Sequence, residues 1–404
     1  MRRSAWTAAF IVLAVSPSLA QVDPERRSQL EGGYEQGLGS PGPSAPYFYV
    51  YLNRPNIMAS SDTLRLVVAP VYFDGELGIK NALGRFGDAG IGLNGGGYAF
   101  GQIEVFRGDE KRGESFTGHG GGPSFSAYPS LGKIGPVPLN GILRVSASYS
   151  DYRRSYATAP QFALPPNEWT GKLRAGLRFG GQEPGLDRAP AAEASVWWES
   201  WDREHNARYG YNGDRAAQGQ TNLYWTRMLF AYTLENGTRL EGRTSFGAGT
   251  DVDRFSAYRL GGMLTLNSEF PMVLPGYFSQ EVAARQVAHV YLRGGMALDD
   301  MKKYVLNVFA AGASIAPVEG TDAGGAQHAG VGTSIEFTPR RGALHGVLSY
   351  GYSPTALRGG GRGGQGVALS IELNLEPRKS KTGQPVYDTQ QGLRWLLGPL
   401  SLTP

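Results

Sequence analysis

Apolar and polar residues alternate along most of this chain with a period of two, in segments of about ten residues. The clearest segment is 366–376, where Val, Leu and Ile at odd-numbered positions alternate with small or polar residues. Because successive side chains of a β-strand point to opposite faces, this pattern predicts a strand with one apolar and one polar face. No segment with a clear helical period separates these segments. We therefore expect an all-β fold.

The same alternation recurs from residue 46 onward, between clusters of Gly, Asn, Asp and Pro. It predicts strands at 142–150, 169–180, 222–235, 238–248, 285–298, 304–316, 327–338 and 343–353, and weaker ones at 47–53, 63–73, 97–106, 115–128 and 191–201. Asn236-Gly237 is a strong signal for a tight hairpin. At about 24 residues per strand and connection the chain has room for sixteen strands, about twelve of them clear.

The two faces of the predicted strands differ in a way that favours a membrane protein. The apolar rows end in aromatic residues, and the opposite faces carry Arg, Glu, His, Ser and Gly; the aromatic ends are Tyr149, Trp169, Phe179, Tyr350 and Tyr352. A soluble β-sandwich or propeller would bury its apolar face and expose many charged residues. In hydrocarbon, a sheet must close on itself to pair every backbone group. We predict a transmembrane antiparallel β-barrel of sixteen strands, with a secreted soluble β protein as the alternative.

The N-terminal residues predict export. Two arginines, an apolar stretch at 5–15 and small residues before Ala20 form a signal peptide. The predicted organisation is a signal peptide at 1–20, a flexible periplasmic lead-in at 21–45, a barrel at 46–376 and a C-terminal tail at 377–404. The expected location is the bacterial outer membrane, in contact with its lipid.

The residue types that most chemistries need are missing or wrongly spaced. The chain has no cysteine, which excludes disulfides and thiolate sites, and its net charge of +4 gives no basic footprint for nucleic acid. The histidines have no metal-binding spacing and are expected to line a polar lumen; they are His119, His205, His289, His328 and His345. We expect no enzymatic activity, no cofactor, no metal and no nucleic-acid partner.

One connection, at 251–280, interrupts the rhythm of strands. It contains the stretch Leu260, Gly261 and Gly262 and, further on, the pair Gly276 and Tyr277. These residues resemble the two motifs of the large sixth loop of the Omp85 superfamily, whose members insert or export outer-membrane proteins and lipids. Five predicted strands follow the connection, which is the number in that family.

The resemblance covers the barrel alone. We place the long loop at 249–284, and Pro275 stands where the family has an arginine that anchors the loop in the lumen. The segment Ala69-Pro70-Val71 resembles the first hairpin of the family. Only the short lead-in separates the signal peptide from the first predicted strand, so we expect the periplasmic POTRA domains of the family to be absent. The resemblance implies a loop folded back into the lumen, and an unfolded outer-membrane protein or a lipid as client.

The charges on the predicted inward faces suggest two arrangements. Basic residues precede the long loop and acidic ones lie on the final strands; they are Arg144, Lys172, Arg174, Arg178, Arg239 and Arg243, and Glu336, Glu372 and Glu376. Opposed arcs of charge would set a transverse field in a pore. The alternative is an ion-pair network that holds the loop, in which Asp251, Asp253 or Glu269 meets the arginines.

Three functions are compatible with these expectations. The first is an Omp85-like barrel that inserts or translocates outer-membrane proteins or lipids through a weak seam between its first and last strands. The second is a passive or gated, porin-like channel with anion preference. The third is a structural barrel that anchors a partner.

Overall fold

A computed structural model describes nine stretches of the chain. They are residues 26–39, 42–97, 102–134, 137–180, 191–234, 238–264, 271–321, 324–339 and 344–375. The predicted signal peptide and C-terminal tail, and Glu269 and Glu376, lie outside these stretches. Within the described residues, no helix is long and apolar enough to cross a membrane.

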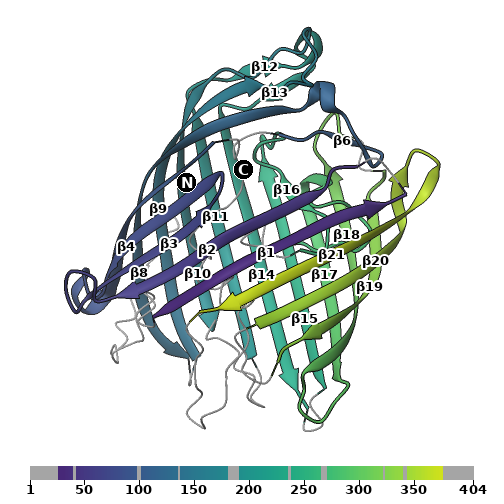
Figure 1. Ribbon diagram of the computed structural model, residues 1–404. Helices are drawn as coiled ribbons and strands as arrows, with labels where there is room; N and C mark the ends of the chain where they lie inside the picture. Colours follow the sequence, from purple (N-terminus) through teal and green to yellow (C-terminus); the bar gives the residue numbers. More distant parts are fainter. Residues whose placement is uncertain are drawn as a thin grey trace, which may run out of the picture.

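The main sheet is a closed antiparallel barrel (Figure 1). It has 17 strands, of which sixteen form the wall and the short β16 (Tyr258–Leu260) belongs to a loop. The wall strands are β1 (Arg27–Leu38), β2 (Ala45–Pro55), β3 (Asp62–Ala69), β4 (Tyr72–Ile79), β5 (Gly87–Gly96), β8 (Phe116–Ile134), β9 (Val137–Arg154), β10 (Glu168–Gly180), β11 (Ala191–Arg203), β14 (Gln220–Thr233), β15 (Arg239–Thr250), β17 (Val282–Ala297), β18 (Tyr304–Pro317), β19 (Gln327–Phe337), β20 (Leu344–Arg358) and β21 (Gly361–Asn374).

Each wall strand pairs with its neighbours in sequence, and β1 pairs with β21 to close the ring. We call this last pairing the closure ladder. It runs without interruption from Gln29 opposite Asn374 to Leu38 opposite Gln365, and the N–H of Leu375 extends it by donating to the carbonyl of Ser28 at 2.9 Å. The closure ladder is longer than the pairing of β2 with β3, which spans only Val50–Pro55 of β2. The predicted seam between the first and last strands is thus fully paired in this closed conformation, and its weakness stays a prediction.

The start of the barrel corrects a prediction. The segment 21–45 was expected to be a flexible lead-in, but Arg27–Leu38 within it is the first wall strand. Its apolar positions, such as Leu30 and Tyr34, are interrupted by glycines and glutamates that hide the alternation. The segment Ala69-Pro70-Val71 consequently joins the second hairpin, β3 and β4, and not the first.

The two faces of the wall are as different as the alternation predicts. Leu143 and Val145 of β9 are 43% and 50% exposed, whereas Arg144 between them is 8% exposed. Aromatic pairs lie near both ends of the wall: Tyr149 and Trp169 have ring centroids 5.4 Å apart, and Tyr304 and Phe337 are 5.1 Å apart. An apolar outer belt flanked by aromatic residues is the surface expected of a barrel in a lipid bilayer.

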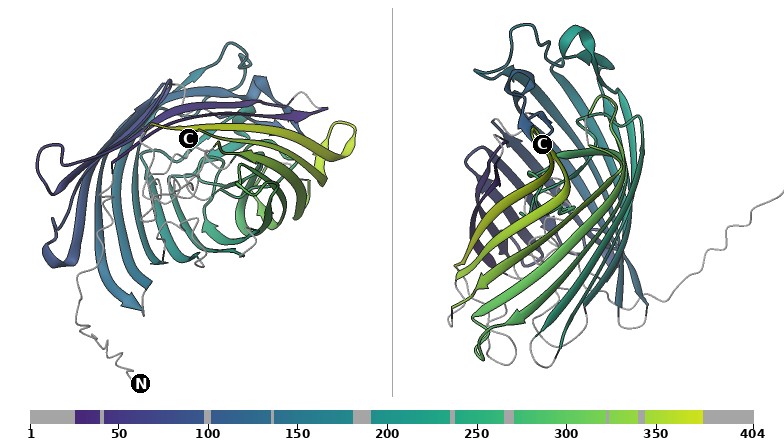
Figure 2. Two further views of the ribbon diagram at one scale, coloured as in Figure 1. Left: turned by 60° about the horizontal axis from the view of Figure 1, so that its bottom comes forward. Right: turned by 90° about the vertical axis from the view of Figure 1, so that its right-hand side faces the viewer.

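The long connections that the structure describes lie at one end of the barrel, which Figure 2 shows in two further views. They carry the short strands β6 (Val105–Phe106), β7 (Asp109–Glu110), β12 (Ala207–Tyr209) and β13 (Arg215–Ala217), and the 3-10 turns η2 (Arg112–Glu114) and η3 (Tyr211–Gly213). At the other end, η1 (Gly84–Phe86) joins β4 to β5. Phe116, Phe162 and Tyr209 form a buried aromatic cluster among the long connections. This cluster packs the long connections together beside the point where the loop after β15 begins.

Candidate functional site

The connection between β15 and β17 is the sixth on the long-loop end, and it folds into the barrel (Figure 2). We call residues 251–281 the inserted loop; the structure describes 251–264 and 271–281 of it. Its apolar side chains form an extended buried cluster with the inner faces of β17 and β18, and Leu260 and Leu274 are fully buried there. Five wall strands follow the loop, as the sequence predicted.

The first motif of the loop sits against β1. Gly261 and Gly262 have φ of +132° and +77°, and a Cβ on Gly261 would lie 2.2 Å from the carbonyl oxygen of Phe278. Only glycine fits both the space and the left-handed backbone. The turn that results aims the N–H groups of Met263 and Leu264 at the buried carboxylate of Glu35, at 2.7 and 3.3 Å. Glu35 of β1 thus holds the loop at the closure ladder.

The second motif sits against β19, β20 and β21. Gly276 has φ of +83°, and a Cβ there would lie 2.3 Å from the backbone N of Ser353. The hydroxyl of Tyr277, which is 3% exposed, lies 2.9 Å from Nδ1 of His328 and 3.0 Å from Oγ1 of Thr355. Burial raises the pKa of Tyr277, so it remains a neutral phenol. The two motifs therefore attach the loop to both sides of the closure ladder.

Arg358, at the end of β20, is the main charged contact of the loop. Its guanidinium donates to the Glu281 carboxylate at 2.7 Å and to the carbonyl of Gly276 at 2.8 Å, and lies 4.5 Å above the ring of Phe278. Burial raises the pKa of Glu281, and the Arg358 guanidinium opposes that shift. Pro275, where an arginine was expected by resemblance, packs against Gly330. The positive charge that anchors the loop comes from the wall here, and the negative charge from the loop.

Sequence analysis missed this anchor for a simple reason. The predicted strand ended at Ser353, five residues before Arg358 and directly before Pro354. The structure continues β20 through a register irregularity between Ser353 and Leu357. Thr355 and Ser353 bind the carbonyl of Ala329 and so keep the strand on β19.

The base of the loop is held by a second set of charges. Asp253 forms an ion pair with Arg203 of β11 and accepts hydrogen bonds from the N–H groups of Phe255 and Ser256. The adjacent Arg254 reaches Glu104 at 3.3 Å. The predicted alternative, in which Asp253 pairs with an arginine, is therefore confirmed for Asp253. Its partner is Arg203, which is not one of the arginines named in the prediction.

The other predicted lumen charges lie on inward faces, but they do not form opposed arcs. Carboxylates lie among the arginines of the same wall: Arg144 with Glu76, Arg174 with Glu199, Arg178 and Arg227 with Glu193, and Arg243 with Glu241. Lys172 lies 3.6 Å above the ring of Trp201, and Arg239 is half-buried. On the final strands, Glu336 pairs with Arg293, and Glu372 is buried opposite His345. The expectation of a transverse field is wrong, because the network alternates in sign.

The histidines at the loop are polar contacts between wall and loop. Nε2 of His289 lies 2.8 Å from the carbonyl oxygen of Val273, and His328 contacts Tyr277. Among the described residues, no group of three or more His, Asp or Glu side chains could hold a metal ion.

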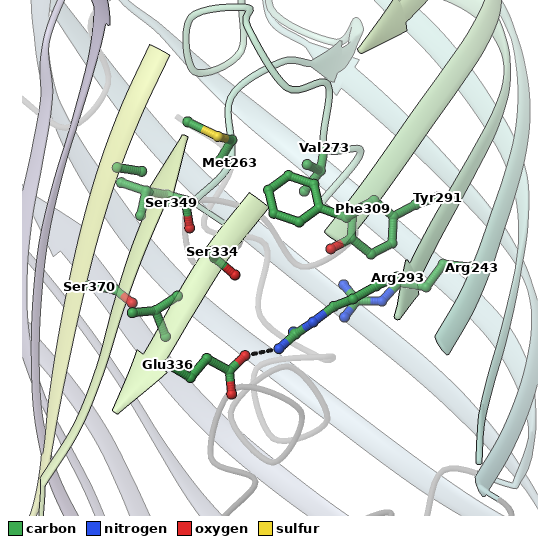
Figure 3. Close-up of a pocket in the computed structure, with 13 residues that line it drawn as sticks. Arg243, Met263, Val273, Tyr291, Arg293, Phe309, Ser334, Glu336, Ser349 and Ser370 are labelled. Atoms are coloured by element: carbon green, nitrogen blue, oxygen red, sulfur yellow. Dashed lines mark ion pairs between the residues drawn. The ribbon is translucent and has the colours of Figure 1, made fainter. Parts of the chain in front are cut away.

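Beneath the loop lies a pocket in the lumen (Figure 3). Its upper part is apolar, with Met263 and Val273 from the loop and Phe309 from β18. Its lower part is polar, and the ion pair of Arg293 with Glu336 crosses it. The remaining lining residues are Arg243, Leu264, Tyr291, Ser334, Val347, Ser349, Ala368 and Ser370.

Solved structures share this barrel fold. CdiB from Acinetobacter baumannii matches with a TM-score of 0.59 and 11% identity, over 86% of this chain and 60% of that chain. BamA from Haemophilus ducreyi lacking POTRA domains 1-3 matches with a TM-score of 0.55 and 12% identity, over 87% of this chain and 71% of that chain. CdiB from Escherichia coli matches with a TM-score of 0.54 and 11% identity, over 87% and 63%.

The chain thus spans less than two thirds of the length of either CdiB chain. No protein-family model and no curated protein sequence matches it. At such low identity the similarity shows the fold alone: a β-barrel like those of CdiB and BamA.

Proposed function

We propose that this chain is an Omp85-like protein of the bacterial outer membrane that assists the insertion or translocation of proteins or lipids. The observation that carries the proposal is the inserted loop. In a sixteen-strand barrel it is the sixth connection at the long-loop end, and both glycine motifs rest on the inner wall beside the closure ladder. A loop that only narrowed a pore would not need contacts with both Glu35 of β1 and Arg358 of β20.

The contacts suggest how the loop would act on the wall. Glu35 lies on one side of the closure ladder, and Arg358 lies one strand beyond the other side. The loop therefore braces the closed wall from inside, and a change at either contact would alter how firmly the first and last strands are held together. An unfolded outer-membrane protein would engage such a wall by strand addition, because main-chain pairing needs no particular client sequence.

A folding assay tests the proposal. The purified protein is reconstituted into lipid vesicles, and a urea-unfolded eight-stranded outer-membrane barrel is added as client. Its folding is followed by gel mobility, and the movement of a fluorescent phospholipid between leaflets is followed in parallel. We expect at least a tenfold acceleration of one of the two processes relative to empty vesicles. If neither process is accelerated, the proposed function is wrong.

A porin-like channel is the alternative, and the structure gives it less support. The inserted loop lies in the bore, and the arginines expected to select anions are paired with carboxylates. Removal of the loop contacts would be needed before a large current could pass.

A further inference from the structure

The wall has a step between β2 and β3. On one side, β2 pairs with β1 along its whole upper part, from Ala45 opposite Glu35 to Asn53 opposite Arg27. On the other side, pairing with β3 begins only at Val50, because β3 ends at Ala69. Among the described residues, 45–49 of β2 are paired with β1 but not with β3. In Figure 1 the β1–β2 hairpin, drawn in purple, continues past the end of β3 and β4.

The backbone of this segment points its free groups outward from the edge. The carbonyl of Ser28 accepts a hydrogen bond across the closure ladder, so the even-numbered residues of β1 bond to β21 and the odd-numbered ones bond to β2. The partners of those odd-numbered residues in β2 are also odd-numbered. The N–H and C=O of Phe48 and the C=O of Pro46 consequently face the side that β3 does not reach. Among the described residues, none forms a backbone hydrogen bond with these three groups.

Pro46 fits the same interpretation. A proline has no N–H to donate and is confined within sheets to edges and strand ends. At position 46 its ring nitrogen faces away from β1, so that no bond of the β1–β2 ladder is lost. The segment thus has the sequence of an edge strand, although it lies in a closed barrel.

The side chains beside the step are apolar. The turn of β3 and β4 beside it is Ala69-Pro70-Val71, and Val68, Val71 and Phe73 around it are 44%, 48% and 42% exposed. By contrast, the turn of β20 and β21 at the same end of the barrel consists of glycine flanked by arginine. An apolar turn is expected where a hairpin ends in lipid or at its boundary, and a polar one where it ends in water. The β3–β4 hairpin therefore ends among apolar side chains, unlike the β20–β21 hairpin.

An open sheet edge among apolar side chains is unfavourable, because apolar surroundings offer no hydrogen bonds to a backbone N–H or C=O. We propose that the edge of β2 at 45–49 is a strand-addition site, which takes up an extended segment of a second polypeptide in the step above β3. This inference rests on the proposed function and names the place where the client would pair, away from the closure ladder. The continuous closure ladder supports this placement, since it leaves no free edge there.

The chemistry of the edge defines the segment that fits. It offers one donor and two acceptors, spaced as in an antiparallel or parallel ladder. The outward position next to Phe48, which is 46% exposed, calls for an apolar side chain facing lipid. The inward positions next to Tyr47 and Tyr49 call for small or polar side chains. A strand of an unfolded outer-membrane barrel has this alternation.

The absence of native cysteine allows a direct test. Three single-cysteine variants are compared in lipid nanodiscs: Phe48→Cys at the edge, Leu369→Cys on the closure ladder, and Val308→Cys in a wall strand paired on both sides. The three side chains are 46%, 42% and 63% exposed on the outer face. The probe is a nine-residue peptide of alternating Val and Thr with a central cysteine, and the readout is the rate of disulfide formation under mild oxidation.

We expect disulfide formation at Phe48→Cys to be at least tenfold faster than at Val308→Cys. A peptide with N-methyl groups on alternate amides should lose this advantage, because it cannot donate to the edge. Equal rates at the two sites, or no effect of N-methylation, would show non-specific apolar binding and overturn the inference. Preferential reaction at Leu369→Cys would also overturn it, and would place the client at the closure while leaving the proposed function intact. No reaction at any site, with acceleration still seen in the folding assay, would overturn this inference alone, and failure of both assays would overturn both.

Discussion

At the scale of single residues, the inserted loop depends on a few buried contacts. One of these contacts is the ion pair between Arg358 and Glu281. Both side chains are 9% exposed, and the guanidinium also donates to the carbonyl of Gly276. Removing one partner of such a pair leaves the other charge buried and unpaired, which lowers the free energy of unfolding more than replacing both partners by apolar residues would. The loop is therefore sensitive to a single substitution in the wall.

We predict that Arg358→Ala lowers the free energy of unfolding by about 3 kcal/mol, because the Glu281 carboxylate loses its partner. The measurement is a urea titration in lipid vesicles, followed by gel mobility. The charge-reversed double variant Arg358→Glu with Glu281→Arg should recover part of the loss. Arg112→Ala is the matched control, since its pair with Glu110 is exposed and should matter little. Equal effects of Arg358→Ala and Arg112→Ala would contradict this account.

A second prediction concerns Gly276. Substitution by Ala places a methyl group 2.3 Å from the backbone N of Ser353 and forces an L residue to φ of +83°. We expect the loop tip to leave the wall, so that external chymotrypsin cleaves at Tyr277 at least tenfold faster than in the parent protein. Gly360→Ala, in the turn of β20 and β21, has open space around its Cβ and should leave cleavage unchanged. Unchanged cleavage of the Gly276 variant would mean that the tip does not need this contact.

At the scale of elements, the sequence predicted the wall well where alternation is strict, as in β19 and β21. It failed where composition and fold disagree. β1 was mistaken for a flexible segment because Gly32 and Gln36 interrupt its apolar face. Its strand state is imposed by neighbours on both sides, which no local pattern records.

The candidate site was predicted unevenly. Gly261, Gly262, Gly276 and Tyr277 were found by resemblance, and their conformations agree with the need for glycine. Arg358 and Glu35 were not found, because their importance arises only when segments far apart in the chain meet at the closure ladder. Likewise, the pairing of lumen arginines with carboxylates depends on strand register, which alternation alone does not fix.

The role of β1 gives a prediction at this scale. Deletion of residues 26–38 removes one side of two ladders and the Glu35 contact, so we expect no heat-modifiable barrel to form from that variant. Deletion of 21–25 alone should leave folding unchanged. Gel mobility with and without boiling measures both. A compact, heat-modifiable species from the longer deletion would show that the barrel closes without β1, as expected of a dispensable lead-in.

At the scale of the whole molecule, the barrel is a wall with lipid outside and a network of paired charges inside. Val331 lies near the middle of β19 and is 52% exposed on the outer face. We predict that Val331→Arg lowers the free energy of unfolding by about 3 kcal/mol in vesicles, because a charge near the midplane must be accommodated in hydrocarbon. Tyr156→Arg, in a loop where the side chain is 97% exposed, should change it little. If Val331→Arg left the free energy of unfolding unchanged, the outer face of β19 would have to be in contact with water.

The central claim is that the loop is anchored inside a closed barrel and occupies its bore. Planar-bilayer conductance of the purified protein tests this claim most directly. We predict silence or brief, small current steps for the parent protein, and longer openings for Arg358→Ala, which loosens the loop. A large, steady, anion-selective current from the parent protein would contradict the account and favour an open channel.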